Sequence, residues 1–194
     1  MKKEALIYVV IALVIGVLVG VIYSNWKSDT APQAAAPGTS SAPPAPVVNY
    51  QQQITTLEGI VKTDPENHNA WVQLGNSYFG ADQPMKAIEA YDKALELQPD
   101  DPNVITDQGV MYRRLGWFDR AIANFRRAAE LAPGHPQSRY NLGVVYRYDL
   151  ADFPKAIAAW EDFLAVSPNG QGADRIRAEI QTMKEHPPIP RSPQ

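Results

Sequence analysis

Residues 71–99 read WVQLGNSYFGADQPMKAIEAYDKALELQP, and the spacing of residue types in this stretch recurs twice further along the chain. Each copy holds a glycine, an aromatic residue, an alanine, a second aromatic residue and a proline in the same order. These residues are Gly75, Tyr78, Ala87, Tyr91 and Pro99; Gly109, Tyr112, Ala121, Phe125 and Pro133; and Gly143, Tyr146, Ala156, Trp160 and Pro168. Successive glycines are 34 residues apart, and a fixed period of this length predicts a tandem array of one structural unit.

The glycine and the proline of each copy predict where helices cross and where they end. Glycine in a helix interior costs about 1 kcal/mol relative to alanine, so we expect the close approach of a second helix to offset that cost. Ala87, Ala121 and Ala156 are the small residues expected on that second helix. Proline cannot continue a helix and biases the preceding residue away from helical conformation. Each copy therefore predicts an antiparallel pair of helices.

This pattern resembles the tetratricopeptide repeat (TPR), a helix-turn-helix unit with a W-x2-L-G-x2-Y…A-x3-F…P grammar. Trp71, Leu74 and Gly75 begin the first copy in that order. The resemblance implies an all-α solenoid of three helix-turn-helix repeats inside a domain that spans residues 49–186. The expected repeats are 68–101, 102–135 and 136–170.

Helices that cover both ends of the array are expected, because the outermost repeats would otherwise expose an apolar face. Leu57, Ile60 and Val61 predict an extra N-terminal helix over about residues 50–63. A C-terminal capping helix is predicted over residues 173–185, where apolar residues recur at helical spacing. The third repeat holds one more residue than the others between its first aromatic residue, Tyr146, and its alanine, Ala156, which predicts a bulged turn over 148–152.

The N-terminal stretch predicts a membrane anchor over residues 5–25. Its uncharged apolar run of 19 residues, 5–23, would form about 28 Å of helix, the thickness of a bilayer core. Residues 1–4 contain two lysines and would stay in the cytoplasm. The expected localisation is thus a single-pass inner-membrane protein with a periplasmic, or extracytoplasmic, C-terminal domain. A cleaved secretory signal is the alternative, although its apolar region is usually shorter.

Other features of the ends are predicted from composition and spacing. Gly16 and Gly20 form a GxxxG spacing that would allow two anchors to pack closely as a homodimer. Residues 26–48 are rich in alanine and proline and predict an extended linker. Residues 187–194 predict a disordered tail.

The residues that catalysis and cofactor binding require are missing or scattered. The chain has no cysteine, and His68, His135 and His186 are too far apart in the sequence to form a metal-ligand motif. It contains no phosphate-binding glycine loop and no nucleophile elbow. We therefore expect no enzyme activity, no cofactor and no metal. The net charge of −3 gives no basic field for nucleic acid, so no nucleic-acid partner is expected.

The resemblance implies a groove that is lined by the first helix of each repeat and that binds a peptide. Amides on this surface can both donate to and accept from a peptide backbone, and arginines can bind a carboxylate. The expected groove residues are Asn69, Gln73, Asn76, Phe79, Asn103, Asp107, Arg113, Arg114, Tyr140, Asn141, Arg147 and Tyr148. The alternative is a merely solvated face, on which the arginines pair with acids such as Asp107 or Asp119.

A family-specific clamp for C-terminal carboxylates is not expected here. Asn76 fits that pattern, but Val72 stands in place of a lysine and Asp107 in place of an asparagine. Gln137 and Asn141 stand where the clamp has basic residues.

The function implied by the resemblance is a membrane-anchored scaffold or chaperone that binds a peptide segment of a client protein. In architecture the chain is similar to bacterial envelope TPR proteins, including TPR subunits of cytochrome c maturation and ancillary translocon chaperones. One alternative is a structural assembly element that self-associates through its repeats or its anchor. Another is a receptor of reversed topology that faces the cytosol.

Overall fold

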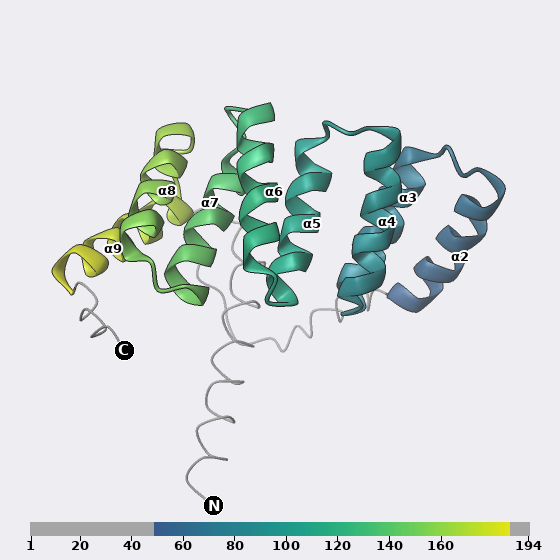
Figure 1. The fold of residues 1–194 in the computed structure, drawn as a ribbon, viewed down its shortest axis with the longest axis horizontal. Helices are drawn as coiled ribbons and strands as arrows, with labels where there is room; N and C mark the ends of the chain where they lie inside the picture. The colour runs from purple at the N-terminus through teal and green to yellow at the C-terminus, as the bar shows by residue number, and fades with distance from the viewer. Residues whose placement is uncertain (1–48, 187–194) are drawn as a thin grey trace, which may run out of the picture. The chain divides into compact units, whose positions relative to one another are not determined.

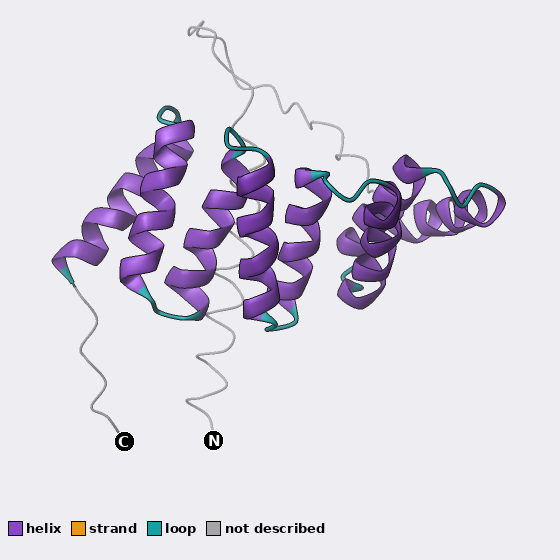
Figure 2. Cartoon of the chain, turned by 45° about the horizontal axis from the view of Figure 1, so that its top comes forward, coloured by secondary structure: helices purple, strands orange, loops and turns teal. Residues whose placement is uncertain are grey.

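The computed structural model describes residues 49–186, which form α-helices and one π-helical turn, without strands in that range (Figures 1 and 2). The elements are α2 (Tyr50–Thr63), α3 (His68–Gly80), α4 (Pro84–Leu97), α5 (Pro102–Arg114), α6 (Phe118–Leu131), α7 (Pro136–Val144), η1 (Val145–Asp149), α8 (Phe153–Val166) and α9 (Gln171–Glu185). Figure 1 shows these helices following one another as a row. The predicted all-α solenoid is confirmed.

The repeats appear as three helix pairs that stack in chain order. They are α3 with α4, α5 with α6, and α7 together with η1 and α8. Each helix packs against the next along the chain, and α5 also contacts α7 directly. The first helices of the second and third repeats therefore lie side by side.

Each repeat is closed by an aromatic ring of its second helix that lies against the glycine of its first helix. The pairs are Gly75 with Tyr91, Gly109 with Phe125, and Gly143 with Trp160. All three rings are buried. A Cβ atom at any of these glycines would overlap the ring, so the predicted close approach of the two helices is confirmed.

The helix starts and turns follow from short polar side chains and from prolines. Asn67, Asp101 and Asp152 each accept a hydrogen bond from a backbone N–H in the first turn of the following helix, which satisfies a group with no intrahelical partner. Proline occupies the first residue of α4, α5 and α7, where its missing N–H costs nothing.

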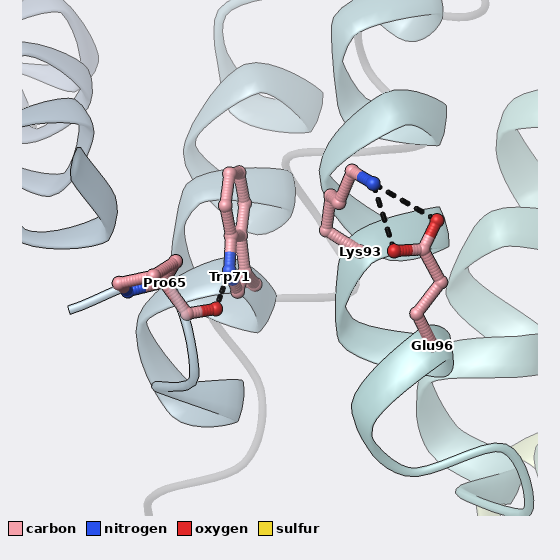
Figure 3. A network of polar contacts seen from close by, with 4 residues as sticks. All are labelled: Pro65, Trp71, Lys93 and Glu96. Carbon is pink, nitrogen blue, oxygen red and sulfur yellow. Dashed lines mark hydrogen bonds and ion pairs between the residues drawn. The ribbon is translucent and has the colours of Figure 1, made fainter.

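Trp71 fixes the turn between α2 and the first repeat. Its indole Nε1 donates a hydrogen bond of 2.8 Å to the carbonyl oxygen of Pro65, as Figure 3 shows.

On α4 the same view shows Lys93 paired with Glu96 through Nζ–O distances of 2.7 and 3.0 Å. Both side chains of that pair are more than half exposed, so the pair contributes little to stability.

Two terminal helices cover the ends of the stack. Helix α2 buries Ile54, Leu57 and Val61, and α9 buries an apolar stripe that includes Ile176 and Ile180. Two clusters of buried side chains fill the interior, one centred on α2 to α5 and the other on α6 to α9. Helix α9 begins at Gln171, slightly before the residue expected from the sequence.

The extra residue of the third repeat lies in a helix and not mainly in the turn, which differs from the prediction. After Val144 the chain widens into the π-helical turn η1, where the amide of Leu150 donates to the carbonyl of Val145 over 3.0 Å. A π-helical turn spans five residues between donor and acceptor and so accommodates one additional residue without breaking the helix.

The predicted localisation is corrected. Between residues 49 and 186 no helix combines the length and the apolar character that crossing a membrane requires. The stretch 5–25, on which the single-pass inner-membrane prediction rested, lies outside the described residues. So do the predicted linker 26–48, the predicted tail 187–194 and the glycines expected to pair in a homodimer.

Candidate functional site

The predicted groove is built on the same register position of the three first helices. Gln73 on α3, Asp107 on α5 and Asn141 on α7 follow one another at intervals of 34 residues. We call the side of α3, α5 and α7 that carries these three residues the groove face. The sequence places an amide, a carboxyl group and a second amide along it.

A cleft of about 770 Å³ lies between α2 and α3 and includes two predicted groove residues, Gln73 and Asn76. Its lining contains no charged residue. The lining residues are Asn49, Tyr50, Gln52, Gln53, Thr56, Leu57, Ile60, Gln73, Asn76 and Ser77. The cleft is therefore rich in amides and hydroxyls beside a few apolar side chains.

Most of the cleft wall comes from α2, which sequence reasoning did not assign to the site. Helix α2 precedes the first copy of the repeat pattern, so its residues have no register position from which a role could be assigned. A sequence signal is present in the run Gln51-Gln52-Gln53, of which Gln52 and Gln53 line the cleft.

Asn76 connects the cleft to the second repeat through Tyr91. The Tyr91 hydroxyl donates a hydrogen bond of 2.7 Å to the Asn76 side-chain oxygen. Burial raises the pKa of Tyr91 above its ordinary value, and the nearby Asp107 carboxylate raises it further. The structure thus brings Asn76, Tyr91 and Asp107 together, although they come from three different helices.

Asp107 is half-buried and has no cation beside it. Burial raises the pKa of its carboxyl group to about 6, and the negative charge of Asp101 adds to the effect. Within residues 49–186 no hydrogen bond and no ion pair reaches the Asp107 carboxylate. A carboxyl group that is desolvated and unpaired on a binding surface is a candidate for ligand contact.

Asn141 is the most buried of the predicted groove residues, with 9% of its surface exposed. Its side-chain Nδ2 has no hydrogen-bond acceptor among the residues that the structure describes. A buried donor without an acceptor is costly, so such a group often marks a place where a ligand or a water supplies the partner.

The three predicted arginines each lie near a carboxylate of this chain. Arg113 and Arg114 are hydrogen-bonded to theirs, whereas the buried Arg147 Nε has no hydrogen-bond acceptor among the described residues. The distances are 2.5 and 3.2 Å from Arg113 to Asp149, 3.0 Å from Arg114 to Asp82, and 3.6 Å from Arg147 to Glu179. Arg114 also lies 4.3 Å over the ring of Phe79. The acids differ from those named from the sequence, but the geometry favours paired arginines.

The remaining predicted residues are separated from the cleft. Asn69 and Asn103 are exposed in the first turns of α3 and α5. The ring centroid of Tyr140 lies 5.8 Å from that of Phe163, and the ring centroid of Tyr148 lies 6.2 Å from that of Trp160. These two tyrosines extend the apolar surface on the third repeat.

A second pocket of about 490 Å³ lies at the turns of the second and third repeats. It is lined by Gly116, Trp117, Phe118, Asp119, Arg120 and Leu150. The Arg120 guanidinium lies 5.0 Å over the Trp117 ring and so covers part of it. Among the described residues, no cluster of three or more acidic or histidine side chains is arranged to hold a metal ion.

Comparison with known proteins supports the repeat pattern. The family model of the tetratricopeptide repeat matches residues 68–101, and a second model with the same description matches residues 90–123. Tetratricopeptide repeat protein 37 of Xenopus laevis is 30% identical over 71 residues, which are 37% of this chain and 4% of that protein. The chain therefore spans only a small part of that relative.

Solved structures share the fold over most of the described residues. A crystal structure of MamA matches with a TM-score of 0.65 and 26% identity, over 71% of this chain and 78% of that chain. The first TPR domain of Spaghetti (RPAP3), solved bound to the HSP90 peptide SRMEEVD, matches with a TM-score of 0.55 and 23% identity, over 63% of this chain and 94% of that one. Residues 68–123 therefore match the tetratricopeptide repeat, and residues 49–186 share the all-α solenoid fold of these solved structures.

Proposed function

We propose that this protein is a scaffold that binds an extended segment of a client protein along its groove face. The observation that carries the proposal is the uncharged, amide-rich cleft between α2 and α3. Glutamine and asparagine side chains carry both donors and acceptors, which is what the alternating N–H and C=O groups of a peptide backbone require. Ile60 and Leu57 offer apolar contact beside them.

Asn141 supports the proposal that a bound segment extends along the groove face to the third repeat. Its buried Nδ2 donor is without an acceptor in residues 49–186, and a rotation of the side-chain amide toward the groove face would let a backbone carbonyl of a bound segment supply one. Because Gln73, Asp107 and Asn141 share one register position, a segment that starts in the cleft would pass all three.

The solved complex of the RPAP3 domain with a peptide is consistent with this proposal. That domain has the same fold and was solved with a bound HSP90 peptide. The present chain differs in the ligand chemistry that it offers, because Arg113, Arg114 and Arg147 already pair with its own carboxylates. Recognition of a carboxylate is therefore not part of the proposal.

Site-specific photo-crosslinking tests the proposal. A benzophenone amino acid is placed at Gln73 in the cleft and, as the matched control, at Lys93, an exposed position on α4. We expect crosslinks to one contiguous segment of a partner from position 73 and none to that segment from position 93.

Three outcomes would decide against the proposal. Equal crosslinking from both positions would show that the groove face is not the binding surface. Crosslinks scattered over many unrelated partner sequences would show non-specific contact. Crosslinks from position 73 to a second copy of this chain would favour self-association instead.

A further inference from the structure

We infer that the groove face selects client segments that carry a lysine or an arginine side chain, which Asp107 binds at the centre of the groove. This inference rests on the proposed function and specifies its ligand. The expected ligand is therefore basic, whereas the three arginines alone would suggest an acidic ligand.

Two arginines of the groove face already have carboxylate neighbours, and of these only Arg113 is hydrogen-bonded to its neighbour within the described residues. Arg113 forms two contacts with Asp149, one of them 3.2 Å between Nη2 and Oδ1, and both side chains are less than a third exposed. Arg147 lies 4.5 Å over the ring of Phe153 and pairs with Glu179. An acidic ligand would have to displace these partners and leave their carboxylates unpaired, which is unfavourable.

The negative charge of Asp107, unlike the charge of Arg113, is not paired with an opposite charge of the described residues. Its carboxylate has no partner in the described range, and it is half-buried, so the local dielectric is lower than that of water. A cationic group placed there would gain a stronger Coulomb interaction than on an open surface, and it would relieve an existing desolvation cost. An anionic group would be repelled.

The position of Asp107 suits a side chain that projects from a bound segment. Tyr91 is near both the cleft residue Asn76 and Asp107, because its hydroxyl donates to Asn76 and the Asp107 carboxylate raises its pKa. A segment whose backbone contacts Gln73 and Asn76 would thus reach Asp107 next along the groove. The buried amide of Asn141 would follow on the third repeat.

The surroundings of Asp107 predict how binding responds to pH. Tyr91 on α4, Asp101 at the start of α5 and His68 on α3 are the titratable groups on this side, and the His68 Nε2 lies 3.9 Å from Asp101. Helices α6 and α7 contribute no ion pair to Asp107 in the part of the chain that is described. Since the pKa of Asp107 is about 6, the carboxylate is charged at neutral pH and becomes protonated as the pH falls below 6.

Selection from a phage-displayed library of random nonapeptides tests the inference on the full-length chain. The wild-type chain, Asp107→Asn and Glu130→Gln are used as baits at pH 7.5. Glu130→Gln is the matched control, because it removes one exposed acidic charge on α6. We expect the wild-type and Glu130→Gln baits to enrich peptides with lysine or arginine at one fixed position, and the Asp107→Asn bait to lose that preference.

The affinity of one enriched peptide then gives the quantitative readout. Because only the ionised carboxylate attracts the cation, we expect binding to the wild-type chain to weaken about tenfold between pH 7.5 and pH 5.0, a change that Asp107→Asn abolishes. Enriched peptides without a basic residue, or an unchanged preference in Asp107→Asn, would overturn the inference and leave peptide binding intact. A wild-type bait that enriches no peptide would contradict the proposed function itself.

Discussion

The environment of Asp107 couples stability to pH at the scale of a single residue. Its folded pKa of about 6 lies above the ordinary value of 3.8, so ionisation opposes folding. The stability that the neutral form gives is fully present below the unfolded pKa and is lost as the pH rises through 6. A group that lowers stability at neutral pH and lies on a binding surface is more easily explained by function than by folding.

Asp107→Asn is therefore expected to stabilise the chain at neutral pH. The pKa change corresponds to about 3 kcal/mol at roughly 1.36 kcal/mol per pKa unit. Because Asp107 is only half-buried, we expect a smaller gain in the free energy of unfolding, about 2 kcal/mol at pH 7.5 and less than half of that at pH 4.5. Urea unfolding of the two chains at both pH values measures this difference. A gain that is the same at both pH values would show that the carboxylate charge is not its origin.

The glycines of this chain give a second prediction at the scale of a residue. Replacing glycine by alanine should lower the stability at one position and raise it at another. Gly109→Ala places a methyl group against the buried ring of Phe125 and is expected to destabilise the fold by about 2 kcal/mol. Gly59→Ala in α2 meets no neighbouring atom and is expected to stabilise it by about 0.5–1 kcal/mol through helix propensity. Thermal unfolding of both variants would contradict this account if the two shifts had the same sign.

At the scale of elements, the turns inside the repeats share one backbone feature. Asp82, Gly116 and Ala151 have φ angles of 55°, 75° and 52° in the turns of the first, second and third repeats. Only glycine adopts this left-handed conformation without steric cost. The third turn therefore holds an unfavourable residue, Ala151, two residues after the end of the π-helical turn η1.

Ala151→Gly is expected to raise the free energy of unfolding by about 1 kcal/mol, since it removes a methyl group from a left-handed backbone position. The reverse change in the second repeat, Gly116→Ala, is expected to lower it by a similar amount. Chemical denaturation of the pair measures both effects. If Ala151→Gly were destabilising, the strain at this turn would not exist.

The helix pairs could be predicted from the sequence, whereas several contacts between the elements could not. The glycines, aromatic residues and prolines predicted the helix pairs, because each acts locally or at a fixed period. The partners of Arg113 and Arg114 were not predictable, since Asp149 and Asp82 lie 36 and 32 residues away. Asp149 ends the π-helical turn η1 and Asp82 lies in a turn, and the repeat pattern specifies neither position. The role of α2 in the cleft was missed for a related reason, because no repeat precedes α3 to provide a register.

At the scale of the whole molecule, each helix of the described domain contacts mainly its neighbours in the chain. In such a stack, the free energy of unfolding is close to the sum of the stabilities of the repeats and of the interfaces between neighbours. A destabilising substitution at one end therefore has little effect on the helices at the other end. The groove face depends on this arrangement, because the cleft is formed at one end of the stack, by α2 and α3.

Cavities at the two ends should therefore loosen different parts of the domain. Ile54→Ala in α2 and Ile180→Ala in α9 each remove a buried side chain, with an expected cost of about 2–4 kcal/mol. Hydrogen exchange is expected to accelerate in α2 and α3 for the first variant and in α8 and α9 for the second. Uniform acceleration along all helices in both variants would show that the domain opens as one cooperative unit.

The structure of the chain bound to a client segment, captured by crosslinking at position 73, tests the central claim most directly. We predict that the segment lies extended along the groove face, with backbone contacts to Gln73 and Asn141 and a basic side chain at Asp107. A segment bound instead on the outer side of α4, α6 and α8, or in the pocket beside Trp117, would contradict the assignment of the groove face as the binding surface.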